Sequence, residues 1–273
     1  MKDRMITPRA GKPGSLAGAT ALLVLALLSI WPALPEARAQ EAHGLFFSAN
    51  QAFREGDYSR AAQGYETLVR QGRAGADVYY NLGNAYFRLG RLGLALVNYE
   101  RARILAPRDP DVDYNLRHAK GMRVDEAEKI REFPAAGWLA KVTGREVFIA
   151  FAAVNALFFL ILALRSFRDW EWTWYAAIGL AILWAVGAFA GGLKGHQAAT
   201  DHRAVVVEDQ IEVRAGPHEE DTLLFLLHTG TVVDQERMED GWRLVRFSQD
   251  KRGWTQAPGV EPIRPLGPGN GPT

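Results

Sequence analysis

Residues 79–107 read YYNLGNAYFRLGRLGLALVNYERARILAP, a stretch that predicts two antiparallel helices. Its apolar and small residues recur at i, i+3, i+4 and i+7, the spacing of one helix face. Gly90 marks the turn between the helices, and Pro107 marks the end of the second. Gly83 and Ala95 lack bulk, so the two backbones can approach closely there. The matching faces consist of Tyr79, Leu82, Gly83 and Tyr86, followed by Ala95, Tyr99 and Ala102.

A second, less regular copy of this pattern lies 34 residues upstream, where Gly56 and Tyr65 correspond to Gly90 and Tyr99. It departs from the pattern at Ser48, Ala52 and Arg73, which replace Leu82, Tyr86 and Pro107. With their 34-residue period and these signature positions, the two copies resemble the tetratricopeptide repeat. The resemblance implies helical hairpins that bind other proteins.

A further helix is predicted after the second copy. Asp109 and Pro110 have the residue types of an N-cap and of a first helical residue. The helix that follows, through Ala119, would cover the apolar face of the second repeat. We therefore expect an all-α module over residues 40–120, close to the lower size limit of a free-standing array.

The first 39 residues have the features of a secretory signal peptide. A basic start precedes an apolar stretch at residues 21–31, and Ala37-Arg38-Ala39 has the A-x-A pattern of a cleavage site. An uncleaved anchor is the alternative, because no charged residue occurs between Pro13 and Pro35. Both interpretations place the repeats outside the cytoplasm.

Two more apolar segments, residues 147–164 and 172–193, predict a transmembrane hairpin, preceded by a juxtamembrane linker at 121–146. As helices they would be about 27 and 33 Å long, comparable with a hydrocarbon core of ~30 Å. The connecting loop, 165–171, contains two arginines, which favours a cytoplasmic loop. Lys141 and Arg145, which precede the first apolar segment, favour the opposite orientation almost equally. The predicted signal peptide therefore decides the orientation. We expect a bacterial inner-membrane protein with both large parts on the periplasmic, extracytoplasmic side.

The C-terminal region changes to short β-branched runs separated by turn residues, which predicts an all-β domain at residues 203–265. Asp240-Gly241 is a hairpin signal between two of these runs. The run 213–217, VRAGP, and the Gly241-Trp242 and Gly253-Trp254 pairs resemble a bacterial SH3-type domain. The resemblance implies a small barrel that docks on cell-wall peptides or on other protein parts. Trp242 and Trp254 are candidates for a ligand platform; a core position is favoured for Trp242, which leaves Trp254 as the predicted ligand-face residue. Residues 266–273 predict a disordered tail.

Composition and motifs argue against an enzyme. The chain has no cysteine, so it has neither disulfides nor thiol chemistry. G-x-S-x-G, Walker A and H-E-x-x-H motifs are absent, and we expect no cofactor and no metal site. The overall net charge is +1, but residues 201–273 carry 13 acidic and 8 basic residues, a charge of −5. This part would repel nucleic acid.

The tetratricopeptide resemblance implies a partner-binding surface on the first helix of each repeat, here called the inner groove. In peptide-binding members of the family, asparagines spaced like Asn50/Asn81 and Asn84/Asn115 hold the ligand backbone or its terminal carboxylate. The lysines of a carboxylate clamp are replaced here by Phe46 and Asp111. The predicted groove residues are Phe46, Asn50, Phe53, Arg54, Tyr80, Asn81, Asn84, Phe87, Arg88 and Asn115, with Tyr114 and His118 from the cap.

The order of parts resembles the tetratricopeptide (E-type, BatE) members of the Bacteroides aerotolerance (Bat) operon proteins. That resemblance implies membrane-anchored von Willebrand factor A-type proteins as partners, and a role in assembly or stress tolerance at the cell envelope. The leading interpretation is a non-enzymatic scaffold whose groove and SH3-type domain both bind proteins. The alternative is a module that anchors the chain to peptidoglycan through the region of Trp254.

Overall fold

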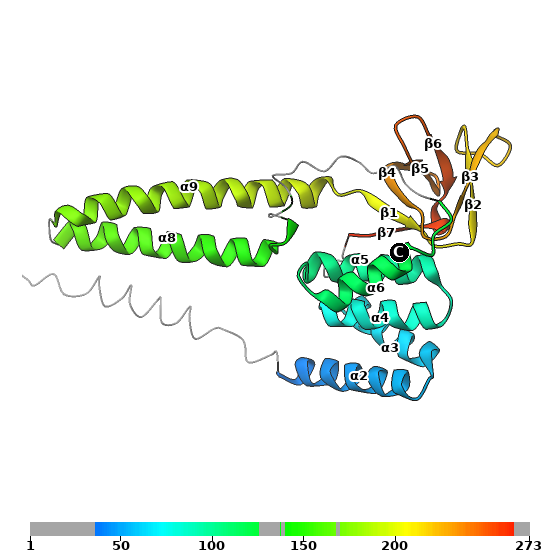
Figure 1. Ribbon diagram of the computed structural model, residues 1–273, viewed down its shortest axis with the longest axis horizontal. Coiled ribbons are helices and arrows are strands. Elements are labelled where there is room, and N and C mark those ends of the chain that lie inside the picture. Colours follow the sequence, from blue (N-terminus) through cyan, green and yellow to red (C-terminus); the bar gives the residue numbers. More distant parts are fainter. Residues whose placement is uncertain (1–35, 126–136, 138–139, 168–169, 265–273) are drawn as a thin grey trace, which may run out of the picture. The chain divides into compact units, whose positions relative to one another are not determined.

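The computed structural model describes residues 36–125, 137, 140–167 and 170–264 (Figure 1). Internal contacts divide the chain into two units, residues 1–44 and 45–273, and of the first unit only residues 36–44 are described. The predicted signal-peptide features before residue 36, part of the predicted linker, residues 168 and 169 of the predicted loop, and the predicted tail all lie outside the described residues.

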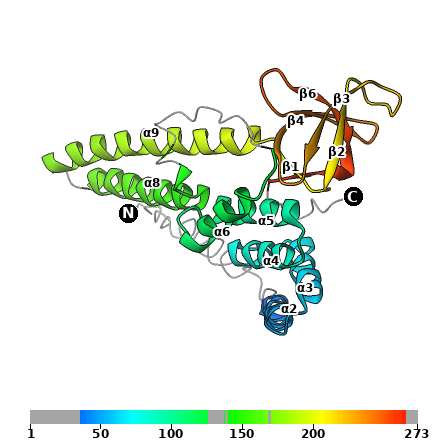
Figure 2. The same ribbon diagram turned by 45° about the vertical axis from the view of Figure 1, so that its right-hand side comes forward.

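The N-terminal part is helical and tetratricopeptide-like, with two helical hairpins followed by a single helix (Figure 2). Gly56 and Gly90 lie in the two hairpin turns with φ angles of 84° and 75°, which confirms the predicted turn at Gly90. The Asp109 carboxylate accepts hydrogen bonds from the amides of Asp111 and Val112, so the predicted N-cap is also confirmed. The helices are α2 (Glu36–Arg54), α3 (Tyr58–Arg70), α4 (Ala76–Arg88), α5 (Leu92–Leu105) and α6 (Pro110–Lys120).

Small residues allow the helices of each hairpin to pack closely. A Cβ atom at Gly83 would lie 2.7 Å from the Tyr99 ring, and one at Gly64 would lie 2.8 Å from the Ala49 side chain. The ring of Tyr99 is fully buried, as is that of its counterpart Tyr65. Because glycine has no side chain, α4 approaches the aromatic face of α5 at this point.

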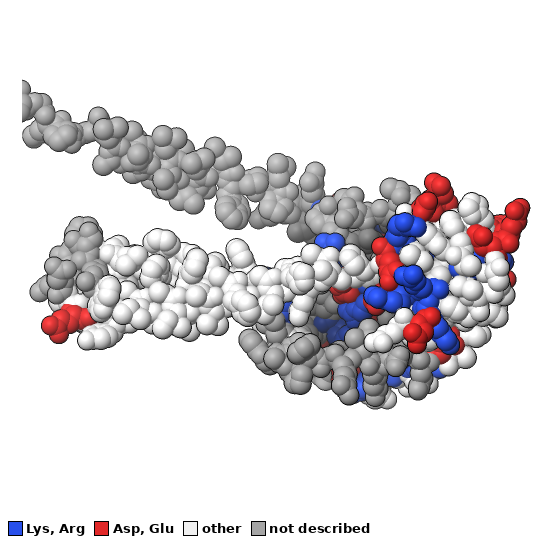
Figure 3. All heavy atoms as spheres, turned by 90° about the horizontal axis from the view of Figure 1, so that it is seen from above, with Lys and Arg blue, Asp and Glu red and all other residues white. Residues whose placement is uncertain are grey.

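Two long apolar helices follow, α8 (Gly144–Phe167) and α9 (Glu171–Thr200), which pack against each other as an antiparallel hairpin. Segments Gly144–Leu164 and Glu171–Thr200 are long and apolar enough to cross a membrane, by length and composition. Figure 3 shows the surface of this hairpin as almost free of charged side chains along its length. Phe151 on α8 packs against Trp184 on α9, with ring centroids 5.6 Å apart.

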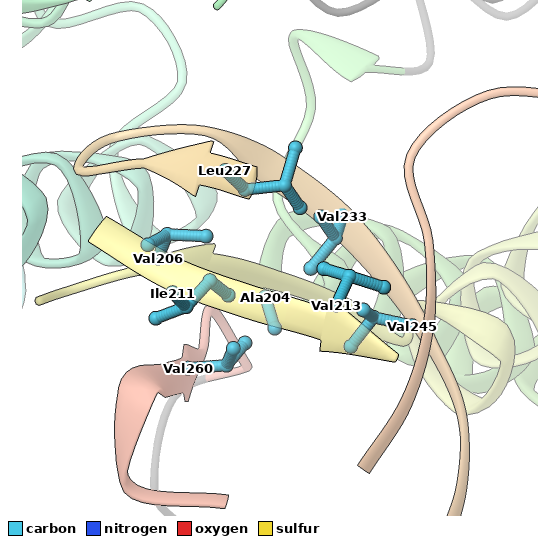
Figure 4. Close-up of a cluster of buried hydrophobic side chains, with 8 residues drawn as sticks. All are labelled: Ala204, Val206, Ile211, Val213, Leu227, Val233, Val245 and Val260. Atoms are coloured by element: carbon cyan, nitrogen blue, oxygen red, sulfur yellow. The ribbon is translucent and has the colours of Figure 1, made fainter. Parts of the chain in front are cut away.

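The C-terminal part is a seven-stranded antiparallel sheet with the order β3-β2-β6-β5-β4-β1-β7. Asp240 and Gly241 form the turn between β4 and β5 with positive φ angles, as predicted. The hydrophobic core of this part includes Val206, Ile211, Val213 and Val245 (Figure 4). The strands are β1 (Arg203–Val206), β2 (Gln210–Arg214), β3 (Leu223–His228), β4 (Val232–Glu239), β5 (Trp242–Arg246), β6 (Arg252–Gln256) and β7 (Val260–Pro262), with a 3₁₀ turn at Ala257–Gly259.

The sheet is not closed into a barrel, so that part of the prediction is wrong. Strands β3 and β7 are the two edges, and they do not pair with each other. Pro262, which has no N–H to donate, lies on edge strand β7. The β1–β7 end of the sheet contacts α5 instead, which covers an edge that a barrel would close by strand pairing.

Helix α5 packs against α4 and α6 of its own module and also against β1 and β7 of the sheet. Most of its residues are therefore buried. A Cβ atom at Gly93 would lie 2.4 Å from the carbonyl oxygen of Val206 and 2.7 Å from the Cα atom of Val207. Backbone atoms cannot move aside as a flexible side chain can. Only glycine therefore allows α5 to reach the end of β1 this closely.

Two adjacent buried charges lie on α5, and one of them, Arg101, pairs across this interface. The Arg101 guanidinium donates to Glu261 Oε1 at 2.6 Å and to the Pro262 carbonyl oxygen at 2.7 Å, and its side chain is only 5% exposed. The Glu100 carboxylate is 2% exposed and is paired with Lys120 at 2.5 Å and with Arg103 at 2.7 Å. A buried charge is tolerated only when it is paired in this way.

A third contact involves the segment that follows α6. The Asp125 carboxylate accepts hydrogen bonds from the backbone amide of His228 at 2.7 Å and from the Thr231 hydroxyl at 2.8 Å. Burial would raise the pKa of Asp125, but these hydrogen bonds outweigh it and lower the pKa. The helical module is thus held against the sheet both by α5 and by the segment that follows α6.

Glu100→Gln should destabilise the packing of α5 against α6 in a pH-dependent manner. Burial alone would raise the pKa of Glu100, but Lys120 and Arg103 lower it below its usual range. A lowered pKa in the folded state stabilises the fold above the unfolded pKa, about 4.3, and this stability is lost as the pH falls through the folded value. At pH 7 the variant should lose about 1.5–3 kcal/mol of stability, the usual contribution of hydrogen bonds to a charged group, because Lys120 and Arg103 lose their carboxylate.

The measurement is the thermal unfolding of both proteins in detergent between pH 7 and pH 3.5. The difference in midpoint between wild type and variant should shrink as the pH falls below about 4. Arg117→Gln, which removes an exposed ion pair with Asp113, is the control and should change the midpoint little. A difference for Glu100→Gln that stays constant with pH would contradict the role assigned to this carboxylate.

Candidate functional site

The inner groove is formed by α2, α4 and α6, which contribute all ten residues predicted for it. The four asparagines are half-buried, and so are Phe46, Phe53, Tyr80 and Phe87. Arg54 and Arg88 are exposed at the ends of α2 and α4. The predicted residues therefore combine accessible polar groups with a partly buried aromatic floor.

The asparagines form hydrogen-bonded units that repeat with the period of the sequence. In the first unit, Asn50 Oδ1 accepts from the Tyr65 hydroxyl at 2.6 Å and from Asn81 Nδ2 at 3.1 Å. In the second unit, 34 residues later, Asn84 Oδ1 accepts from the Tyr99 hydroxyl at 2.8 Å and from Asn115 Nδ2 at 2.9 Å. Here the first helix of each repeat, like the cap helix α6, is called an inner helix, and the second helix of each repeat is called the outer helix. Each hydrogen-bonded unit joins an inner helix to the outer helix of the same repeat and to the inner helix that follows.

This arrangement fixes which way each amide points. A carbonyl-type oxygen has two lone pairs, and both are used at Asn50 and at Asn84. Within the described part of the chain, no protein acceptor pairs with the Nδ2 group of either residue. The fold therefore leaves one amide donor group for each repeat available to a ligand.

The tyrosines that fix these amides keep their protons at neutral pH. Burial raises the pKa of Tyr65 to about 12, although the positive charge of Arg54 lowers it in part. Burial also raises the pKa of Tyr99, and the neighbouring Tyr80 raises it further. Both hydroxyls are thus hydrogen-bond donors over the whole physiological range. From the sequence, Tyr65 and Tyr99 are predicted only to pack between helices, although their 34-residue spacing, shared with Asn50 and Asn84, is a signal for this second role.

A pocket of about 260 Å³ lies in the groove where the second repeat meets its neighbours. It has contributions from α2, α4, α5 and α6, so it depends on the stacking of all three inner helices. None of its lining residues is acidic. They are Phe53, Asn84, Phe87, Arg88, Tyr99, Asn115 and His118.

Aromatic side chains lie beside the two exposed arginines, of which Arg88 lines the pocket and Arg54 does not. The Arg88 guanidinium lies 4.5 Å from the centroid of the Tyr58 ring, and Arg54 lies 5.9 Å from that of Phe47. Phe53 packs edge-on against Tyr58 with centroids 5.2 Å apart. An aromatic face orients a guanidinium while leaving its N–H groups free for an acceptor.

The other predicted groove residues contact the asparagines, the tyrosines or the histidine already described. Asn115 also donates to the Tyr80 hydroxyl at 3.0 Å, and the Tyr80 ring lies 6.1 Å from that of Tyr99. The Phe46 ring lies 6.1 Å from that of Tyr65. Tyr114 is exposed and stacks on His118 at the cap end of the groove.

The prediction for Trp254 is wrong. Its side chain is only 6% exposed, because it lies on the interior strand β6 and the guanidinium of Arg237 covers its ring at 5.0 Å. Trp242, predicted to be in the core, is instead half-buried and lines a shallow hollow beside Glu219 and Glu220. The tryptophan available to a ligand on the sheet is therefore Trp242.

Comparisons with known proteins identify the repeat but not the whole chain. Residues 76–109 match the tetratricopeptide repeat family, which covers α4, α5 and the turn before α6. No curated protein matches the chain. Among the residues that the structure describes, no group of three or more His, Asp or Glu side chains is placed to hold a metal ion.

Tyr99→Phe should loosen the second unit without disturbing the core packing. The substitution removes only the hydroxyl that donates to Asn84, at a cost of about 0.5–1.5 kcal/mol. Hydrogen–deuterium exchange should show faster exchange of the α4 and α5 amides, by about twofold to tenfold. Tyr65→Phe should have the same effect on α2 and α3.

Tyr58→Phe is the matched control. It keeps the ring that contacts Phe53 and Arg88, and its hydroxyl makes no hydrogen bond to any described residue. Equal exchange in the Tyr58 and Tyr99 variants would mean that the tyrosine hydroxyls do not hold the groove together.

Proposed function

We propose that this chain is a non-enzymatic, membrane-anchored scaffold whose inner groove binds a segment of a partner protein. The observation that supports it most directly is the pair of fixed amide donors, one from Asn50 and one from Asn84. They lie on inner helices of a tetratricopeptide-like module, and repeats of this kind mediate protein–protein interaction. An extended segment crossing the groove would meet the same polar group in each repeat.

The anchor in this proposal is the hairpin of α8 and α9, which has the length and apolar character needed to cross a membrane. Its exposed surface is rich in Phe, Leu, Ile and Trp, with Phe148, Tyr175 and Phe189 among the most exposed. Such an apolar surface is unfavourable in water and favourable in lipid. The hairpin would hold the two folded parts beside the membrane.

Contacts between these parts support a hairpin that returns to the side from which it entered. Arg101 precedes α8 in the chain and Glu261 follows α9, yet the two side chains form a buried ion pair. Asp125 and His228 are likewise linked across the hairpin. Two parts that share an interface must share a compartment. The predicted signal peptide then favours the extracytoplasmic side of a bacterial inner membrane for both parts in this proposal.

The resemblance to the E-type Bat proteins extends the proposal to partners. It favours membrane-anchored von Willebrand factor A-type proteins, and a role in stress tolerance at the cell envelope. The C-terminal sheet, which in sequence resembles a bacterial SH3-type domain, would supply a second contact. Tethering makes this second contact effectively intramolecular, so two weak sites can act together.

Peptidoglycan anchoring through the sheet is the alternative function. The residue on which it depended, Trp254, is buried. The hollow lined by Trp242 still offers an aromatic face beside two carboxylates, a surface suited to the amino groups of a wall peptide. We place it second, because only this shallow hollow supports it.

Loss of groove side chains should remove partners from the complex. Asn84→Ala combined with Arg88→Ala takes away one amide donor and one cation of the second repeat. Proteins that co-purify with the wild-type chain from detergent-solubilised membranes should be depleted about tenfold or more with this variant.

The matched control combines Gln63→Ala with Arg70→Ala on the outer helix α3, where both side chains are exposed. Mass spectrometry compares the three samples. An unchanged set of co-purifying proteins in the groove variant would contradict the proposed function.

Labelling of single cysteines should show the sidedness, because the chain has no cysteine of its own. Phe47→Cys on α2 and Met238→Cys on β4 place thiols at positions that are 62% and 58% exposed. In right-side-out spheroplasts both should react with a membrane-impermeant maleimide. Trp170→Cys, between the two apolar helices, should react only after permeabilisation. Different accessibility of the first two thiols would contradict the hairpin anchor.

A further inference from the structure

We infer that the inner groove selects an internal acidic segment of its partner, bound as an extended chain with one acidic side chain for each repeat. This inference rests on the function proposed above and concerns only the chemistry of the bound segment. It follows from the charges, hydrogen-bond donors and aromatic surfaces that α2 and α4 present.

The first argument is charge. Arg54 and Arg88 occupy equivalent positions, 34 residues apart, and both are exposed. Neither forms an ion pair with a carboxylate of the described residues. Other arginines of the same module are paired with acidic residues, among them Arg60, Arg70, Arg101, Arg103, Arg108 and Arg117. The two groove arginines are therefore available to an acidic ligand.

The second argument is the direction of hydrogen bonding. The Oδ1 atoms of Asn50 and Asn84 already accept two hydrogen bonds each, so these amides can offer a ligand only their N–H groups. Arginine likewise only donates. A ligand that fits must present acceptors, which are backbone carbonyl oxygens and carboxylates. A basic segment would offer the two arginines no carboxylate and would be repelled by their charges.

The third argument excludes a chain terminus as the preferred ligand. A terminal carboxylate carries one concentrated charge and needs one cluster of cations. Here the cations are divided between two repeats, and the positions of the clamp lysines hold Phe46 and Asp111. Two separate arginines fit two separate side-chain carboxylates better than one terminus.

The spacing follows from the geometry of packed helices and extended chains. Neighbouring helices are about 8–10 Å apart, and an extended chain of the polyproline II type advances about 3.1 Å for each residue and repeats its side-chain direction every three residues. The direct hydrogen bond from Asn81 to Asn50 shows that α2 and α4 are such neighbours. The two acidic residues should thus be about three positions apart. Phe53 and Phe87 offer half-buried rings to an apolar residue between them.

The experiment measures fluorescence anisotropy with the purified full-length chain in detergent. The probe is a labelled ten-residue peptide, acetylated and amidated at its ends, with two glutamates three positions apart and a leucine between them. A second probe replaces both glutamates with glutamine, and a third carries a free C-terminal carboxylate. Binding is measured at low and at moderate salt, because screening weakens pairs between exposed charges.

The glutamate probe should bind at least tenfold more tightly than the glutamine probe, and more weakly as salt rises. Arg54→Gln and Arg88→Gln should each weaken its binding about threefold to tenfold, and the double variant more than either. Arg70→Gln on the outer helix is the control and should leave binding unchanged. The glutamine probe should be insensitive to all of these substitutions.

Equal binding of the glutamate and glutamine probes, or binding of neither, would overturn the inference. Tighter binding of the free-carboxylate probe would replace the internal segment by a terminus and would also overturn it. A peptide copying residues 126–136 of this chain, which include Glu126, Glu128 and Glu132, is tested as well. If that peptide binds most tightly, the groove is occupied by the chain's own segment, and the inference of a partner segment is overturned. The co-purification of partners with the Asn84/Arg88 double variant decides the proposed function separately.

Discussion

The buried contact between α5 and the β1–β7 end of the sheet is the constraint on which the rest of this structure depends. Two short helical hairpins and a cap provide little apolar surface to bury, and an array of this size is marginal by itself. Here the outer side of α5 is covered by another part of the same chain, with Gly93 against the backbone of β1. Arg101 and Glu100, both buried, pair with Glu261 and with Lys120 and Arg103. Because an unpaired buried charge is costly, the Arg101–Glu261 pair, which crosses the interface, also specifies its register, which hydrophobic packing alone does less sharply.

This constraint connects the membrane anchor with the binding surface. The segments on either side of the apolar hairpin are far apart in sequence, but the interface requires them to meet. It also occupies the outer helix of the second repeat and leaves the inner groove accessible, since the groove is formed by α2, α4 and α6. The sheet thus takes the place that a further repeat has in a longer array, where each repeat covers its neighbour. In the proposed scaffold, a partner held in the groove would therefore be held in a fixed relation to the sheet.

The helical part was predictable because its signals are local. Turn glycines at 34-residue spacing, small residues at the contact of α4 and α5, and the Asp109-Pro110 cap all act within one or two helices. The interface was not predicted, since it joins Arg101 to Glu261 and no local pattern records such a pair. One signal was present, because the apolar residues of Leu92–Leu105 are not confined to one face, so this helix has no wholly polar side to leave in water. The open sheet and the burial of Trp254 depend on strand order, which short β-runs do not specify.

The groove itself shows how a fold can prepare a binding site before any ligand arrives. An asparagine amide on a free surface can rotate, so a ligand must fix it at an entropic cost. Here the buried hydroxyls of Tyr65 and Tyr99 and the amides of the next inner helix fix each asparagine from within. Stacking of the repeats and orientation of the donors are therefore the same set of hydrogen bonds. A sheet that stabilises α5 thereby stabilises Tyr99, and with it the direction in which Asn84 presents its donor.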